Sequence, residues 1–225
     1  LIVALEDGLH FFDPDTGRDE FFVQPEDGRP ENRGNDGKPD PAGNMWLGTM
    51  PMVQDKVGGL YRIAPDGSSR CVIDGLGCAN GLGWSPDGKT MYFIDTPSRA
   101  VWAFDYDEKA GEIDLNSRRT VVDFTGFAPE EGGPDGMTVD AEGKLWVAQW
   151  GGCRVCRYDE ITGEKLMQVD VPAPCTSCPT FGGEKLDKLF ITTAGFGKEK
   201  FPEAGSLFVA DVGVCGRKAN RFGRE

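Results

Sequence analysis

Residues 132–150 read GGPDGMTVDAEGKLWVAQW, and this stretch decides the fold. Two apolar segments, Met137–Val139 and Leu145–Ala148, flank a polar turn that contains Glu142-Gly143. Short β-forming runs on either side of a glycine-containing turn predict a β-hairpin. Just before the first predicted strand, Asp135 stands between a proline and a glycine. Because Pro-Asp-Gly is also ordinary turn chemistry, Asp135 is either a plain turn residue or a carboxylate placed for function.

The same layout occurs earlier in the chain. Residues 80–95 read NGLGWSPDGKTMYFID, with a polar residue before a glycine, a short strand, an Asp-Gly turn and an aromatic-rich strand. Asn80 occupies the place that Asp135 occupies in the later copy. Two oxygen-bearing side chains are therefore predicted to open equivalent strands of two repeats.

Apolar anchors of predicted strands recur along the whole chain at steps of 44, 46, 54 and 44 residues: Ile2, Trp46, Tyr92, Trp146 and Phe190. A period in this range, with several short strands per unit and no helical periodicity, predicts a β-propeller. Five units are visible, and residues 1–225 are expected to form one domain. Residues Gln24–Asp40 and Phe124–Gly133 read as long polar loops between blades, and loops of that length are usually functional.

The composition limits the partners. The net charge is −13, from 24 basic and 37 acidic residues, which argues against nucleic acids and anionic membranes. It is compatible with a cation or a neutral small molecule as ligand. No apolar run approaches the roughly 18 residues of a membrane-spanning helix, and the hydrophobic content of 39% is enough for a core.

Seven cysteines include two CxxC pairs, Cys153/Cys156 and Cys175/Cys178. We do not expect them to bind zinc, because Cys153 and Cys156 read as part of one strand, where residues i and i+3 point to opposite faces, and histidine partners are lacking. The odd count favours reduced thiols in a cytoplasmic protein. The single histidine, His10, lies in a predicted strand without the neighbours that Ser-His-Asp chemistry needs.

Several motifs occur in a fixed order over essentially the whole chain: Asn32–Lys38 with Asp40–Gly43, Gly48–Met50, Asn80–Leu82 with Ser85–Gly88, Gly133–Gly136, and Thr176–Cys178 with Phe181–Gly183. Together they resemble the gluconolactonase, senescence-marker and luciferin-regenerating family of six-bladed propellers. The resemblance implies an all-β, six-bladed propeller whose first blade is missing or incomplete in this chain, which is N-terminally truncated relative to the family.

The resemblance also implies a site for one divalent cation, Ca²⁺, Zn²⁺, Mn²⁺ or Mg²⁺, held by a glutamate, an asparagine and an aspartate. By motif, the asparagine is Asn80 and the aspartate is Asp135. The family's glutamate lies in a Gly-Glu-Gly-Pro stretch that this sequence does not contain. The substrate-side residues correspond to Arg33 and Asn35, with Asp36 beside them.

These residues suggest a chemistry. Oxygen ligands favour a hard or borderline cation, and such an ion polarises a lactone carbonyl and acidifies water. Asp135 would be both a metal ligand and the catalytic base, while Arg33 and Asn35 would bind sugar hydroxyls or developing charge. The expected function is therefore hydrolysis of a small sugar lactone. Two alternatives stay open: a related propeller hydrolase acting on another ester or phosphoester, and a non-catalytic cation-binding propeller.

Overall fold

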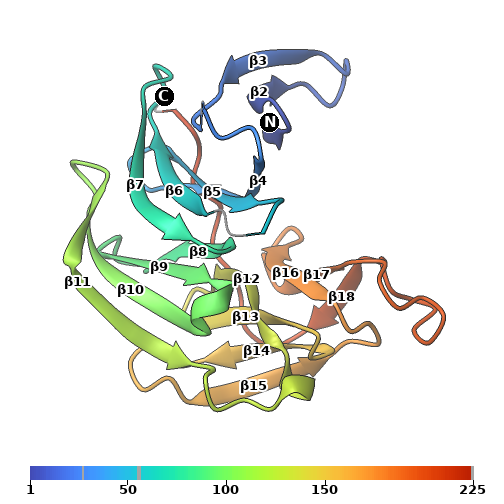
Figure 1. The fold of residues 1–225 in the computed structure, drawn as a ribbon. Helices are drawn as coiled ribbons and strands as arrows, with labels where there is room; N and C mark the ends of the chain where they lie inside the picture. Colours follow the sequence, from blue (N-terminus) through green and yellow to red (C-terminus); the bar gives the residue numbers. More distant parts are fainter. Residues whose placement is uncertain (27, 55–56, 224–225) are drawn as a thin grey trace. The chain divides into compact units, whose positions relative to one another are not determined.

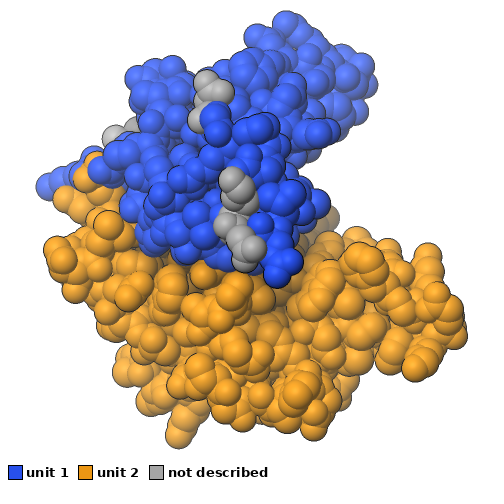
Figure 2. Space-filling model, viewed as in Figure 1, with its two compact units in different colours: residues 1–79, 109–111, 220–225 blue, residues 80–108, 112–219 orange. Residues whose placement is uncertain are grey.

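The computed structural model describes residues 1–26, 28–54 and 57–223. The chain divides into two compact units, coloured separately in Figure 2. Unit 1 comprises residues 1–79, 109–111 and 220–225, and unit 2 comprises residues 80–108 and 112–219. Each unit is described by itself below.

Unit 1 contains two antiparallel sheets, drawn in blue to cyan in Figure 1. The first sheet has the strand order β1-β2-β3, and the second has the order β4-β5-β6-β7. Their bounds are β1 (Ile2–Leu5), β2 (Gly8–Phe12), β3 (Asp19–Val23), β4 (Asn32–Pro39), β5 (Met45–Pro51), β6 (Gly58–Ile63) and β7 (Ser69–Leu76).

Unit 2 contains three antiparallel sheets, again with strands paired in chain order. The strands are β8 (Ala79–Trp84), β9 (Thr90–Asp95), β10 (Ala100–Asp107) and β11 (Glu112–Asp123), then β12 (Gly133–Val139), β13 (Leu145–Trp150), β14 (Arg154–Tyr158) and β15 (Lys165–Asp170), and finally β16 (Thr176–Gly182), β17 (Lys188–Thr193) and β18 (Phe208–Asp211). Two short 3₁₀ helices, η1 (Thr96–Ser98) and η2 (Pro129–Glu131), precede β10 and β12.

Each sheet is a meander of consecutive strands, which is the blade of a β-propeller. The sequence predicted a propeller of six blades with an incomplete first blade, and this number of blades was wrong. The described residues form five blades, of which the first and the last have three strands and the others four. In the described part of the chain, no helix has the length and the apolar character that crossing a membrane requires.

The predicted hairpin is confirmed. Val139 pairs with Leu145 across β12 and β13, and the turn is closed by a hydrogen bond from the Asp140 N–H to the Lys144 carbonyl at 3.0 Å. Gly143 adopts a φ of 87° in this turn, a left-handed conformation that glycine reaches at little cost. The turn therefore has a steric reason for its glycine.

The sequence Asp-x-x-Gly-x-x-Trp occurs in a four-stranded blade of each unit, and its two copies make the same buried contact. Asp40 accepts the indole N–H of Trp46 at 2.8 Å, and Asp140 accepts that of Trp146 at 3.0 Å. Both carboxylates are fully buried. Asp140 also accepts the Nε–H of Arg157 at 2.8 Å, so its charge is paired inside the sheet. This contact fixes the hairpin turn to the core of its own blade.

Apolar side chains pack in layers within each unit. In unit 1, the core contains Leu9, Met45, Leu47, Tyr61 and Ile63, against which Ile2 and Phe22 pack. In unit 2, one cluster joins residues of β9 and β10 to residues of β12, β13 and β14, and a second cluster joins β13 and β14 to β16 and β17. The inner strands β8 and β13 are buried along almost their whole length, whereas the outer strands β11 and β15 are largely exposed.

Two expectations drawn from turn chemistry were wrong. Residues Gln24–Asp40 are not one loop, because Asn32–Pro39 forms β4 and pairs with β5, with a register shift between Gly34 and Gly37. Asp135 does not stand before its strand but inside β12, at a register shift between Pro134 and Met137. In both places, an irregular strand is hidden in the sequence by glycine, asparagine and aspartate.

Candidate functional site

Asn80 and Asp135 lie near the starts of β8 and β12, and a third residue joins these two strands. The Asn80 side-chain amide donates to the Thr96 hydroxyl at 2.8 Å. The Thr96 hydroxyl in turn donates to the carbonyl of Pro134 at 2.8 Å, directly before Asp135. Thr96 belongs to η1, which follows β9. The two predicted ligands are therefore linked through one hydroxyl group within unit 2.

Glycines beside both predicted ligands allow close approach of the backbones. A Cβ atom at Gly81 would lie 2.8 Å from the Asp135 carbonyl oxygen and 2.7 Å from the Cβ of Met137. A Cβ at Gly136 would lie 2.5 Å from the Ser177 carbonyl oxygen. Real Cβ atoms do not come that close to non-bonded atoms. Any residue other than glycine at position 81 or 136 would therefore push its strand away from the neighbouring one.

Asp135 is partly buried, and its charge acts on the Cys175 thiol. Burial raises the pKa of the Cys175 thiol, and the charges of Cys153 and Asp135 act in the same direction. Cys175 is paired through an isolated bridge with Trp150, at the end of β13.

Arg33 and Asn35, the predicted substrate-side residues, lie on β4 in unit 1. The Arg33 guanidinium donates to the Gly34 carbonyl at 2.9 Å and to Oδ1 of Asn35 at 3.2 Å. The Asn35 amide donates to the carbonyl of Ala79 at 2.9 Å. Arg33 is exposed, so its charged head is open to solvent, while Asn35 ties β4 to the residue that precedes Asn80 in the chain.

Asp36 differs from its neighbours because its carboxylate is only partly satisfied. One oxygen accepts the N–H of Gly37 at 2.7 Å. The other oxygen, Oδ2, is buried and has no hydrogen-bond partner among the residues that the structure describes. Burial raises the pKa of Asp36, while the charge of Lys38 acts in the opposite direction. A carboxyl group in this state holds a proton more readily than an exposed one.

Arg33 also lines a cavity of about 330 Å³ in unit 1. The other walls come from the β1–β2 turn, the β3–β4 connection, the start of β4 and β5, and they carry the polar residues Gln24, Glu26, Arg29, Asn32 and Thr49. A cavity of this size with several convergent polar groups is suited to a small polar ligand.

The oxygen donors present at Asn80 and Asp135 fit a hard divalent cation, which prefers amide and carboxylate oxygens. Two side chains supply only part of the six to eight oxygens that calcium takes. Among the described residues, no group of three or more His, Cys, Asp or Glu side chains is arranged to hold a metal ion. A site shared by Asn80 and Asp135 would have an asparagine as one of its ligands.

The cysteines do not form the predicted strand pair. Cys153 precedes β14 and has a φ of 56°, whereas Cys156 lies inside β14 and donates to the side chain of Gln149 at 3.0 Å. The expectation that both cysteines share one strand was therefore wrong. The absence of zinc remains a prediction.

A family model described as the SMP-30/Gluconolactonase/LRE-like region matches residues 1–195. The chain belongs to this family. Its sequence is 42% identical to regucalcin from Homo sapiens over 197 residues, covering 82% of this chain and 64% of that protein. It is 37% identical over 222 residues to a putative sugar lactone lactonase, YvrE, from Bacillus subtilis, covering 96% of this chain and 74% of that protein.

A solved structure gives the same fold. The crystal structure of regucalcin from Agrobacterium tumefaciens, described as a calcium-binding protein, superimposes with a TM-score of 0.91 at 31% identity. The match covers 99% of this chain and 76% of that structure. The chain thus spans about two thirds of the length of the curated regucalcins that it matches.

Sequence reasoning missed two parts of this region. Thr96 carries no recognisable motif, since a Thr-Pro pair after a strand is common in turns. The polar groups around Glu26 were assigned only to a loop. Both depend on hydrogen bonds between residues far apart in the sequence, which a periodic pattern does not record.

Proposed function

We propose that this protein hydrolyses a sugar lactone with one bound divalent cation. The observation that carries the proposal is the Thr96 hydroxyl, which links the Asn80 amide to the strand segment that carries Asp135. The similarity to a putative sugar lactone lactonase supports the choice of substrate class. The description of the Agrobacterium relative as calcium-binding supports the choice of a divalent ion.

In this proposal, the side-chain oxygens of Asn80 and Asp135 hold the cation. A bound divalent cation supplies Lewis acidity, which polarises an ester carbonyl and lowers the pKa of water. Asp135 accepts the proton of the water that attacks the lactone carbonyl. The ring C–O bond then breaks, the ring oxygen takes up a proton, and the product is the open hydroxy acid.

Arg33, Asn35 and Asp36 bind the sugar part of the substrate. The exposed Arg33 guanidinium offers donors in a planar fork to hydroxyl or carboxylate oxygens. Asp36 stands beside them on β4, with one buried carboxylate oxygen that other described residues leave without a hydrogen bond. We propose that the protein is cytoplasmic. Its expected partner is a small-molecule lactone, and we expect neither a nucleic acid nor a membrane as a partner.

Two further functions remain as alternatives. A related hydrolase would act on another ester or phosphoester with the same residues. A non-catalytic cation-binding propeller would hold the cation with Asn80 and Asp135 without turnover, and the description of the Agrobacterium relative as calcium-binding supports this alternative.

The deciding experiment is a substrate panel. The purified protein is stripped with EDTA, supplied in turn with Ca²⁺, Mg²⁺, Mn²⁺ or Zn²⁺, and assayed for acid release from five- and six-membered sugar lactones. Acid release above the protein-free rate that depends on the cation supports the proposal. Turnover of aryl esters or phosphoesters alone favours the related hydrolase. Stoichiometric cation binding without any turnover favours the non-catalytic alternative.

A further inference from the structure

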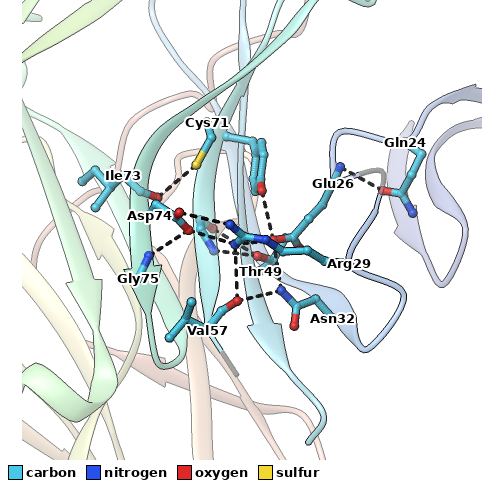
Figure 3. Close-up of polar contacts among 12 residues, drawn as sticks. Gln24, Glu26, Arg29, Asn32, Thr49, Val57, Cys71, Ile73, Asp74 and Gly75 are labelled. Atoms are coloured by element: carbon cyan, nitrogen blue, oxygen red, sulfur yellow. Dashed lines mark hydrogen bonds and ion pairs between the residues drawn. The ribbon is translucent and has the colours of Figure 1, made fainter. Parts of the chain in front are cut away.

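Glu26 is a buried carboxylate in the connection between β3 and β4, and Figure 3 shows it surrounded by donors from different elements. Its Oε1 accepts the Tyr61 hydroxyl at 3.0 Å, the Asn32 amide at 3.0 Å and the Arg29 guanidinium at 3.4 Å. A buried charge persists only when it is paired and hydrogen-bonded. These three donors satisfy that condition and hold the connection against β6.

Arg29 fastens the same connection to β7. Its guanidinium makes two parallel hydrogen bonds to the Asp74 carboxylate, at 2.8 and 3.0 Å. These bonds raise the pKa of Arg29 above its usual value. A bidentate arginine–carboxylate pair fixes orientation as well as distance. The connection is therefore held at two points of the sheet.

Asn32 connects these anchored residues to Arg33. It is the first residue of β4, and its amide donates to Glu26 and, at 2.9 Å, to the Val57 carbonyl. Arg33 follows directly, and its guanidinium donates to the Met52 sulfur at 3.2 Å, to the Gly34 carbonyl at 2.9 Å and to Asn35 Oδ1 at 3.2 Å. All of these partners except Met52 belong to β4, so the position of the Arg33 side chain depends on how the start of β4 is held.

Arg33 and residues hydrogen-bonded around Glu26 also line the same cavity. Glu26, Arg29, Asn32 and Arg33 all line the cavity of about 330 Å³ in unit 1. The Arg29 guanidinium and the Asn32 amide share two acceptors, Glu26 Oε1 and the Val57 carbonyl, through hydrogen bonds that Figure 3 draws as dashed lines. A movement of this wall would displace Arg33 together with Asn32.

We infer that Glu26 is a positioning residue for Arg33, which it holds in place through Asn32. The inference rests on the proposed function, in which Arg33 binds the sugar part of the lactone. Glu26 itself touches no reacting atom. Its role is to keep the start of β4 in one conformation, so that the guanidinium is pre-organised before the substrate binds.

The test uses two conservative variants and a matched control. Glu26→Gln removes the charge but keeps the shape, and Tyr61→Phe removes only the hydroxyl that donates to Glu26. Glu20→Gln removes an ion pair of similar length, with Arg18 at 2.9 Å, in which both side chains are exposed. Steady-state kinetics on the lactone that the wild type prefers give KM and kcat separately. The ¹H–¹⁵Nε signal of Arg33, assigned with Arg33→Lys, reports the order of the guanidinium without any substrate.

We expect KM to rise about tenfold in Glu26→Gln and Tyr61→Phe, with kcat within about twofold, because loss of binding that is equal in the ground state and the transition state raises KM alone. The Arg33 signal should broaden or shift in both variants and stay unchanged in Glu20→Gln. An Arg33 signal identical to the wild type in both variants overturns the inference, as does an unchanged KM in an active protein. If the wild type hydrolyses no lactone, the proposed function fails, and the Arg33 signal alone decides the inference.

Discussion

The Thr96 hydroxyl orients the side chain of Asn80. It donates its single proton to the Pro134 carbonyl, so it can only accept from the Asn80 amide, which lies 2.8 Å away. The nitrogen of the amide must therefore face Thr96, and its carbonyl oxygen must face away. Outer groups of this kind commonly set the direction of metal ligands.

Thr96→Val should weaken cation binding. Valine keeps the shape but removes the hydroxyl, so Asn80 loses the partner that orients its oxygen. We expect the Kd for Ca²⁺, measured by isothermal titration calorimetry, to rise about tenfold, which is the lower end for loss of an outer group. Thr96→Ser keeps the hydroxyl and should bind nearly as the wild type does. Equal losses in both variants would show that the hydroxyl is not the cause.

The repeat was predictable from the sequence because turn residues and apolar strands alternate in it. The hairpin of Val139 and Leu145 follows from local chemistry alone. β4 was not predictable, because Asn32–Pro39 is rich in residues that strands usually avoid. Its pairing with the strongly apolar β5 supplies what its own composition lacks.

The candidate site was predictable only in part. Asn80 and Asp135 were predicted as ligands because they occupy equivalent places in two repeats and match the family's motifs, and their role stays a prediction. Thr96 and Glu26 were not found, because their partners lie 38 and 35 residues away in the chain. Such contacts depend on the packing of whole strands, which no local pattern encodes.

Asp140→Ala should destabilise unit 2 strongly. It would leave the buried Trp146 N–H without its acceptor and remove the main buried partner of Arg157. Loss of one member of a buried ion pair costs about 3–5 kcal/mol of unfolding free energy, which urea denaturation can measure. Glu142→Gln is the matched control, since Glu142 is the exposed partner of the same arginine. A comparable loss in the control would mean that burial is not the cause.

Asp36→Asn should stabilise the fold at neutral pH and weaken substrate binding. Because burial raises the pKa of Asp36, its ionised form is the unfavourable one in the folded state. The penalty is absent below the pKa of the unfolded chain and grows as pH rises through the folded-state pKa. The variant should therefore gain roughly 1 kcal/mol at pH 7, and the gain should shrink towards pH 4.

The measurement for Asp36→Asn is urea unfolding at both pH values, together with KM for the lactone. A gain that is the same at pH 4 and pH 7 would mean that the charge of Asp36 is not the source of the effect. A KM equal to that of the wild type would remove Asp36 from the substrate side.

Asp135→Asn tests the mechanism most directly. Asparagine keeps the size and one ligating oxygen, so the cation should still bind, but the negative charge and the proton acceptor are lost. If Asp135 takes the proton of the attacking water, kcat at saturating cation should fall by about 10²-fold or more, as expected for a positioned general base. Asn80→Ala should instead raise the Kd for the cation, with activity partly recovered at high cation concentration. Near-normal turnover of Asp135→Asn at saturating cation would leave Asp135 as a structural residue of β12, and the catalytic role would then be excluded.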